Sequence, residues 1–402
     1  MLRHLINICP LTLSVLLACA CSDRSTGVER DTEFALRTEL GRTLSALRIT
    51  GGEMWGTVVP GLAAAAIIDE KSHGIVAAAF SGAVDPPAHR PLREASRFHI
   101  GSPTKTFTAA LIMQLDQEGK LSLDDAISTW INYENAKNIT IKMLLGHTSG
   151  IPNFFSAEGR TPEDSPKDLI ELSKSLKPSF SPGLAWEYSN TNYIILGVIS
   201  EKVTGLTWQE QIETRFIQPL GLTDTYVWNG EPVGPTVNGS RMACSGNAEP
   251  ECDPPESSLK LLAVTDGFDW KASWAAGAIV STPTDLARWM RSLVSGDILD
   301  VEHRQLLTTP TQQSVQALSG NLASDEHHGS LRWTGYSLGL CRFEVDREGI
   351  GWGHSGVING FVSNVVQMMD SGDTVSLTSN FEYFDKLEGL GYLVMAVGEI
   401  QP

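Results

Sequence analysis

The sequence has few basic residues for its length. Its 402 residues include 30 lysines and arginines against 47 aspartates and glutamates, which gives a formal net charge of −17. This excess of negative charge disfavours binding to nucleic acid or to anionic membranes through the bulk surface. A local basic pocket is still compatible with it.

Internal repeats, low-complexity tracts and long apolar runs are also missing. No segment beyond the N-terminus is apolar for long enough to span a membrane. The composition, 42% hydrophobic and 19% charged, is typical of a folded globular protein and excludes a disordered one. The length allows one large domain or two moderate ones.

The N-terminal segment MLRHLINICPLTLSVLLAC has the pattern of an export signal, with a positive charge, an apolar stretch and then small residues. Its end, Leu-Leu-Ala-Cys, resembles the lipobox at which bacterial lipoproteins are cleaved. We expect residues 1–18 to be a lipoprotein signal peptide, Cys19 to carry lipid, and residues 19–30 to form a linker. The alternative is a secretory signal cleaved near Ala20. Both predict export, and the first predicts a lipid-anchored protein that faces the periplasm.

Cysteine is scarce, with six residues, two of which lie in or at the end of this signal. Cys244 and Cys252 bracket the Gly/Pro/acidic stretch CSGNAEPEC, and an oxidising compartment favours joining them in a disulfide. The alternative is two free surface thiols. No histidine stands nearby at ligand spacing, so we expect no metal site there.

Strand patterns lie at both ends of the chain and helical patterns lie between them. Residues 61–84 indicate two strands, the stretches from GYSLGLCRFEV to DTVSLTSN indicate several more, and a final helix is expected from about Asp385. The pattern predicts an α+β fold in which an antiparallel sheet is built from both chain ends, with flanking helices and an inserted, mostly helical subdomain. We expect one domain over residues 31–402, with an α/β part at about 31–95 and 285–402 and a helical part at about 96–284.

The stretch FHIGSPTKTFTAALIMQL places Ser102 and Lys105 at the start of an apolar helical run, with Pro103 where proline is favoured. Side chains three residues apart share one helix face, so the lysine can act as a base for the hydroxyl. A buried lysine loses proton affinity, which suits that role. The alternative is Ser102 as a helix cap and Lys105 as a solvated residue. The same spacing recurs at Ser257, in a loop.

Two further motifs are weak alone. Tyr188 and Asn190 in EYSNTNY place a phenol and an amide before a helix, where the phenol can pass protons. The alternatives are a half-buried aromatic and a helix cap. His354-Ser-Gly in GWGHSGVINGF lies in a Gly-rich strand that a substrate backbone can approach. Similar spacings recur at Tyr133 and His327.

The order and surroundings of these motifs resemble the serine β-lactamase-related family, which includes D-alanyl-D-alanine carboxypeptidases, class C β-lactamases and related esterases. The resemblance extends from about Arg97 to Phe361 and also rests on ITIKMLLGHTSGIP and AAGAIVSTPTDLARWM. It implies a nucleophile, its base and a proton relay at Ser102, Lys105 and Tyr188. It implies substrate binding by Asn190, His354, Ser355, Gly356 and Val357, with an oxyanion hole from the backbone N–H groups of Ser102 and Val357.

Class C β-lactamases usually carry Lys-Thr-Gly where this chain has His354-Ser-Gly. This departure is more typical of the exported carboxypeptidases. The expected function is therefore D-alanyl-D-alanine carboxypeptidase activity on peptidoglycan stem peptides through a Ser102 acyl-enzyme, with no metal or organic cofactor. The alternatives are a β-lactam or small-ester substrate, or a non-catalytic penicillin-binding sensor. Expected partners are these substrates, and a membrane only through the lipid. His147, in GHTSG, is interpreted as structural, capping a helix near the site.

Overall fold

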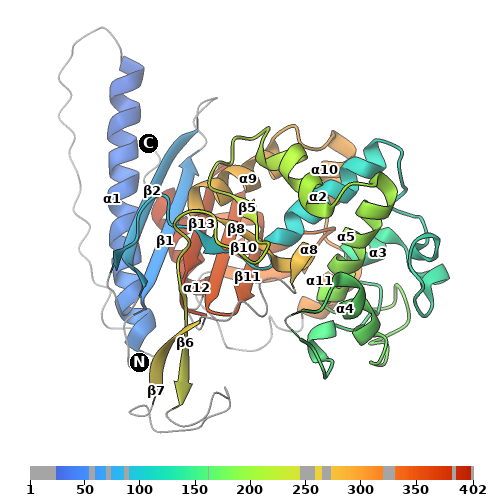
Figure 1. The fold of residues 1–402 in the computed structure, drawn as a ribbon. Helices are drawn as coiled ribbons and strands as arrows, with labels where there is room; N and C mark the ends of the chain where they lie inside the picture. The colour runs from blue at the N-terminus through green and yellow to red at the C-terminus, as the bar shows by residue number, and fades with distance from the viewer. Residues whose placement is uncertain are drawn as a thin grey trace.

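Both ends of the chain contribute to one antiparallel sheet at the centre of the molecule (Figure 1). The computed structural model describes residues 24–53, 59–68, 74–85, 90–161, 163–244, 259–264, 273–319, 331–382 and 386–399. The strand order is β3-β2-β1-β13-β12-β11-β10-β9. These strands are β1 (Gly61–Ile68), β2 (Ile75–Asp85), β3 (Arg90–Pro91), β9 (Leu331–Tyr336), β10 (Cys341–Val345), β11 (Gly349–Ile358), β12 (Phe361–Met368) and β13 (Thr374–Ser379).

Strand β1 joins the two ends of the chain, because it pairs with β2 on one side and with β13 on the other. Its sequence GLAAAAII is buried along its whole length. The run of alanines leaves room for helices to pack closely on both faces of the sheet. Helices α1 (Arg24–Glu53) and α12 (Lys386–Gly398) cover one face, and α9 (Pro283–Ser295) covers the other. The α+β fold expected from the sequence is confirmed.

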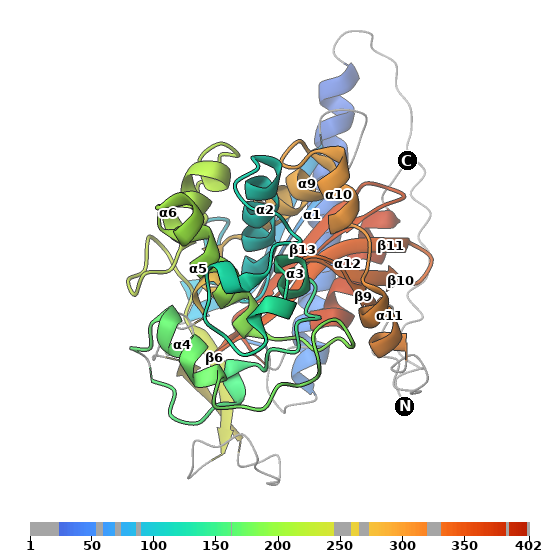
Figure 2. The ribbon, with the colours of Figure 1, turned by 90° about the vertical axis from the view of Figure 1, so that its right-hand side faces the viewer.

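A group of helices packs beside the α9 face of the sheet (Figures 1 and 2). It comprises α2 (Thr104–Gln117), α3 (Ile141–Leu145), α4 (Pro166–Ser173), α5 (Asn190–Thr204), α6 (Trp208–Ile212), α8 (Trp274–Gly277), α10 (Val301–Leu307) and α11 (Gln312–Ser319). Single turns lie at Ile127–Thr129, Ala136–Asn138, Phe154–Ser156 and Glu213–Ile217. Helix α2 is almost entirely buried in this group, so the residues at its N-terminus are held rigidly against the sheet.

Two smaller groups of strands lie outside the large sheet. Strands β4 (Phe98–His99), β8 (Ile279–Ser281) and β5 (Tyr226–Val227) form a three-stranded sheet, and β6 (Gly239–Cys244) pairs with β7 (Leu259–Val264). The β6–β7 pair lies within the part expected from the sequence to be mostly helical. Helix α1 begins at Arg24, within the stretch expected to form a linker over residues 19–30.

Several expectations fall outside the described residues. They concern the signal peptide over residues 1–18, the lipid on Cys19 and one partner of the expected disulfide, Cys252. The division into an α/β part and a helical part stays a prediction. Among the helices that the structure describes, none is both long and apolar enough to cross a membrane.

His303 ties α10 to the end of α2. Its Nε2 lies 2.7 Å from Asp116 Oδ2 and its Nδ1 lies 2.8 Å from Asp300 Oδ1. Burial lowers the pKa of His303, but the two carboxylates outweigh burial and raise it above its ordinary value of 6.5. The charged imidazole therefore stabilises the fold fully below pH 6.5, and this contribution is lost as the pH rises through the raised pKa.

We expect His303→Gln to lower the free energy of unfolding by about 1 kcal/mol at pH 6, because both partners are partly exposed. The loss should be smaller at pH 9 than at pH 6, because the contribution of the charged imidazole falls as the pH rises through its raised pKa. Urea unfolding of both proteins at the two pH values measures this. A loss that is the same at both values would show that protonation of His303 plays no part.

Candidate active site

The turn before α2 places Ser102 at the edge of a cavity. Gly101 has a φ of 58°, a conformation that glycine adopts readily, and it turns the chain from β4 into the helix. Pro103 occupies the helix cap position, and α2 has no side-chain cap. The Ser102 hydroxyl therefore does not cap the helix, which removes the structural alternative for this residue.

Lys105 lies one turn further and is completely buried. Its Nζ lies 3.1 Å from Ser102 Oγ, 2.7 Å from Asn190 Oδ1 and 2.7 Å from the carbonyl oxygen of Ala276. Burial lowers the pKa of Lys105 well below its ordinary value, and the electrostatic effect of Cys341 opposes this only in part. The amine can therefore lose its proton much more easily than a solvated lysine.

The three contacts of Lys105 are not equivalent. The Asn190 and Ala276 oxygens can only accept hydrogen bonds, so each must receive an N–H from the amine. A neutral amine has two N–H groups and one lone pair, and the remaining contact is with a hydroxyl that can donate. The geometry thus directs the lone pair of neutral Lys105 at the Ser102 hydroxyl, which is the arrangement of a general base and its nucleophile.

Tyr188 and Asn190 come from the start of α5. Asn190 is the first residue of the helix, and its side chain bonds to Lys105 instead of capping the helix. The Tyr188 ring lies 5.0 Å from Lys105 Nζ. Burial raises the pKa of Tyr188 well above 10, and the nearby Ser102 hydroxyl offsets this only partly. The raised pKa keeps the phenol protonated, and its buried oxygen completes no hydrogen bond within the described residues, so it can donate a proton.

His147, which follows the end of α3, holds this segment in place. Its Nδ1 accepts the backbone N–H of Ser189 at 3.2 Å, and its carbonyl oxygen accepts the N–H of Glu187. Because a backbone N–H can only donate, Nδ1 carries no proton. Burial is the main cause that lowers the pKa of His147 well below 6.5, so the ring is neutral. His147 thus bonds to Ser189, the N-cap residue of α5, and fixes the backbone on both sides of Tyr188.

Strand β11 approaches the start of α2 very closely at Gly356. A Cβ atom added there would lie 2.3 Å from the Ile100 carbonyl oxygen and 2.9 Å from the Ser102 nitrogen. The next residue, Val357, is half exposed and lines the same cavity as Ser102. Pairing between β10 and β11 extends only as far as Gly353. In the described ranges, no strand pairs with the rest of β11 on that side, which leaves an edge that an extended peptide can join.

The side chain of His354 is buried beneath this strand. Its Nδ1 lies 2.7 Å from the carbonyl oxygen of Ser355, and its Nε2 lies 3.1 Å from the Tyr336 hydroxyl. A carbonyl only accepts, so Nδ1 carries the proton and the phenol of Tyr336 donates to Nε2 of the neutral ring. Of the four residues of this strand that were expected to bind substrate, Val357 lines the cavity, whereas His354, Ser355 and Gly356 do not.

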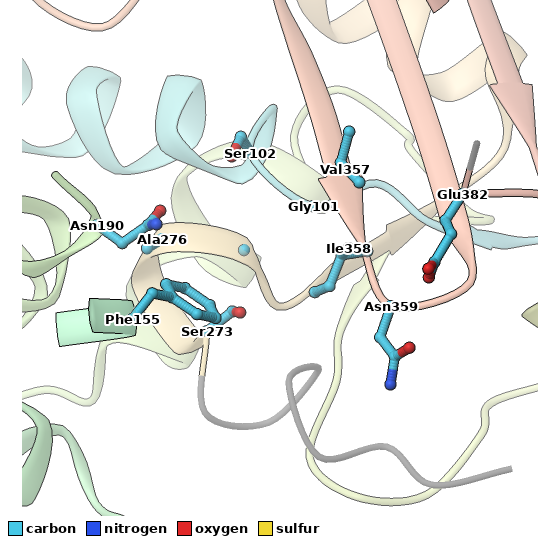
Figure 3. Close-up of a pocket in the computed structure, with 11 residues that line it drawn as sticks. Gly101, Ser102, Phe155, Asn190, Ser273, Ala276, Val357, Ile358, Asn359 and Glu382 are labelled. Carbon is cyan, nitrogen blue, oxygen red and sulfur yellow. The ribbon is translucent and has the colours of Figure 1, made fainter. Parts of the chain in front are cut away.

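The cavity has a volume of about 370 Å³. Figure 3 shows Ser102, Asn190 and Ala276 on its helical side, and Val357, Asn359 and Glu382 on its strand side. The full lining is Gly101, Ser102, Phe155, Asn190, Ser273, Ala276, Gly277, Val357, Ile358, Asn359 and Glu382. The space is large enough for an acyl group of more than one amino acid.

The competing motifs do not contribute to this site. Tyr133 bonds to Ser173 and lies with Asn135 at a separate, small hollow, whereas Ser257 and His327 lie outside the described residues. Sequence reasoning missed the Ala276 carbonyl, Tyr336 and Glu382. The stretch AAGAIVSTPTD indicated that the region around Ala276 belongs to the family pattern. The sequence could not single out its carbonyl oxygen, because every residue has one.

A family model described as beta-lactamase matches residues 48–398, which include every residue of this site. The chain belongs to the beta-lactamase family. This family of serine hydrolases includes the relatives named penicillin-binding proteins, as expected from the motifs.

Two relatives and one crystal structure illustrate the similarity. Penicillin-binding protein 4* of Bacillus subtilis is 34% identical over 146 residues, 35% of this chain and only 32% of that protein. Penicillin-binding protein 4 of Amycolatopsis lactamdurans is 27% identical over 329 residues, 80% of this chain and 81% of that protein. A D-stereospecific amidohydrolase from a Streptomyces species is 26% identical, with a TM-score of 0.68 over 91% of this chain and 97% of its own.

Proposed function

We propose that this beta-lactamase family member cleaves amide bonds next to D-amino acids through an acyl-enzyme on Ser102, with D-alanyl-D-alanine peptides as its substrates. The observation that carries the proposal is the contact set of Lys105. Two obligate acceptors fix its N–H groups, and its lone pair is left for the Ser102 hydroxyl.

In the acylation step, Ser102 Oγ attacks the carbonyl carbon of the scissile bond and its proton passes to Lys105 Nζ. The oxyanion accepts hydrogen bonds from the N–H groups of Ser102 and Val357. Within the described residues, the N–H of Ser102 donates to no backbone carbonyl, so it is available for this role. The C–N bond then breaks, and the leaving amine takes a proton from Lys105 by way of the Tyr188 hydroxyl.

In the second step, water attacks the ester on Ser102. Lys105 accepts a proton from the water, and the serine oxygen regains a proton as the acid leaves. The same groups thus serve both halves of the reaction. Asn190 orients Lys105 through its Oδ1 and lines the cavity, so its amide is also placed to bind the substrate.

Support for a peptide substrate comes from the exposed edge of β11 and from the names of the relatives. The edge offers backbone groups to an extended chain. Penicillin-binding proteins are among the curated relatives, and the amidohydrolase similarity adds D-stereospecificity. Together with the expected export as a lipoprotein, these features favour the peptides of the cell wall as substrates.

A second candidate function is the hydrolysis of D-amino acid amides, whose leaving group carries no carboxylate. Both ring nitrogens of His354 are bonded within the protein, so this ring has no free N–H for the carboxylate of a leaving D-alanine. The amidohydrolase from Streptomyces is consistent with this alternative.

The test uses the purified full chain with N-acetylated L-Lys-D-Ala-D-Ala, its all-L isomer, and D-alaninamide. We expect the wild-type chain to release D-alanine from the first peptide and to release no alanine from the all-L peptide. We expect the Ser102→Ala variant to hydrolyse none of the three substrates. Release of ammonia from D-alaninamide alone would favour the second candidate. Hydrolysis of neither D-substrate, or activity retained in Ser102→Ala, would contradict the proposal.

Tyr188→Phe is expected to lower turnover of the substrate that the wild-type chain hydrolyses by about 10²-fold. This loss should be smaller than the loss caused by replacing the base, Lys105. The reason is that burial keeps the phenol protonated, so it relays a proton but cannot initiate the reaction. Rapid-mixing assays with amide and ester substrates of one acyl group measure this. The amide should suffer more, because its amine leaving group needs the proton; equal losses would contradict a relay role.

A further inference from the structure

The cavity contains a carboxylate that the proposed reaction does not use. Glu382 follows β13 and lines the strand side of the cavity, beyond Asn359 (Figure 3). A charged side chain in a substrate cavity either serves the fold or recognises a charge on the ligand. The hydrogen bonds of Glu382 distinguish these roles.

One oxygen of Glu382 serves the fold. Oε2 accepts the backbone N–H of Gly360 at 2.7 Å, which fixes the two-residue turn between β11 and β12. The backbone N–H of Glu382 donates to the Ser240 carbonyl oxygen. These bonds hold the carboxylate at the end of β11, on the strand that carries Val357.

Among the described residues, Gly360 is the hydrogen-bond partner of this carboxylate and it uses Oε2, so Oε1 is left without a protein partner there. A turn needs one acceptor, and a neutral side chain such as glutamine could supply it. The negative charge is therefore not required by the turn. It lies in a cavity with the nucleophile, where it attracts a cation and repels an anion.

We propose that Glu382 forms a subsite for a primary ammonium group on the acyl part of the substrate. The inference rests on the proposed function only in taking Ser102 as the acylated residue. Ser102 fixes the scissile carbonyl at the helical side, and the acyl chain extends along β11 toward Glu382. Two substrate sources share this chemistry: the α-amino group of a D-amino acid amide, and the side-chain amino group of a stem peptide.

The test measures binding to the Ser102→Ala protein, in which no turnover occurs, by titration calorimetry. One probe pair is D-phenylalaninamide and its N-acetyl derivative. The other is Nα-acetyl-L-Lys-D-Ala-D-Ala and the diacetylated peptide, which lacks the side-chain charge. In at least one pair, we expect the free amine to bind roughly tenfold more tightly, and that pair identifies the source.

Adding Glu382→Gln should abolish the preference while leaving affinity for the acetylated probe unchanged, because glutamine still accepts from Gly360. Glu302→Gln removes the same charge from the exposed start of α10 and should leave the preference intact. No preference in either pair, or a preference that survives Glu382→Gln, would overturn the subsite. Failure of the proposed function appears separately, as the absence of Ser102-dependent hydrolysis by the wild-type chain.

Discussion

Replacement of Lys105 with methionine is expected to slow acylation of Ser102 by about 10²–10⁴-fold, the usual contribution of a positioned general base. Methionine has a similar length and no charge, so it fits the buried site but cannot take the hydroxyl proton. The loss should appear in the acylation rate rather than in substrate binding, because Lys105 does not line the cavity.

The pH dependence gives the same prediction an independent test. Burial lowers the pKa of Lys105, so the wild-type acylation rate should rise with pH as the amine loses its proton and then level off. The residual rate of Lys105→Met should lack this step. Both rates can be followed by intact mass during reaction with a penicillin.

The matched control is Lys260→Met, because Lys260 is the lysine of the competing Ser-x-x-Lys pattern and lies on β7. It should leave the acylation rate unchanged. Circular dichroism verifies that each variant is folded. A Lys105→Met protein that is folded and reacts within tenfold of the wild-type rate would contradict the assignment of Lys105 as base.

Replacement of Gly356 with alanine is expected to reduce acylation by about 10²–10³-fold, the effect of losing an oxyanion donor. The new methyl group would lie 2.3 Å from the Ile100 carbonyl oxygen and 2.6 Å from Pro103 Cδ. Two backbone segments would have to separate, which moves Val357 away from Ser102. Overpacking of this kind also destabilises a fold by about 1–3 kcal/mol.

Gly41→Ala is the matched control, since an added Cβ meets nothing within 4 Å in helix α1. It should stabilise the protein by about 0.5–1 kcal/mol and leave acylation unchanged. Acylation rates and urea unfolding of both variants separate the two effects. If Gly356→Ala is acylated at the wild-type rate, close contact between β11 and α2 is not needed for acylation.

The fold and part of the site could be predicted from local patterns. Ser102 and Lys105 share a helix start, so their spacing places them on one helix face, where they can come into contact. The apolar run of β1 and the patterns near the C-terminus predicted a sheet from both chain ends, and β1 indeed pairs with β13. These features depend on interactions between near neighbours or on periodicity.

The rest depends on contacts between distant segments. Asn190 and Ala276 reach Lys105 from 85 and 171 residues away, and the second contact uses a backbone oxygen. The role of Gly356 requires the position of Ile100, and that of Glu382 requires the turn at Gly360. His354 was expected beside the substrate, yet its ring is buried against Tyr336. A strand pattern predicts which side chains alternate, but not what lies against each face.

The most direct test of the central claim is the intact mass of the full chain over time with benzylpenicillin, followed by peptide mapping. The structure predicts one covalent adduct per chain, on the peptide that contains Ser102, and no adduct with Ser102→Ala. An adduct that forms equally well on Ser102→Ala, or that maps to another residue, would contradict the assignment of Ser102 as the nucleophile.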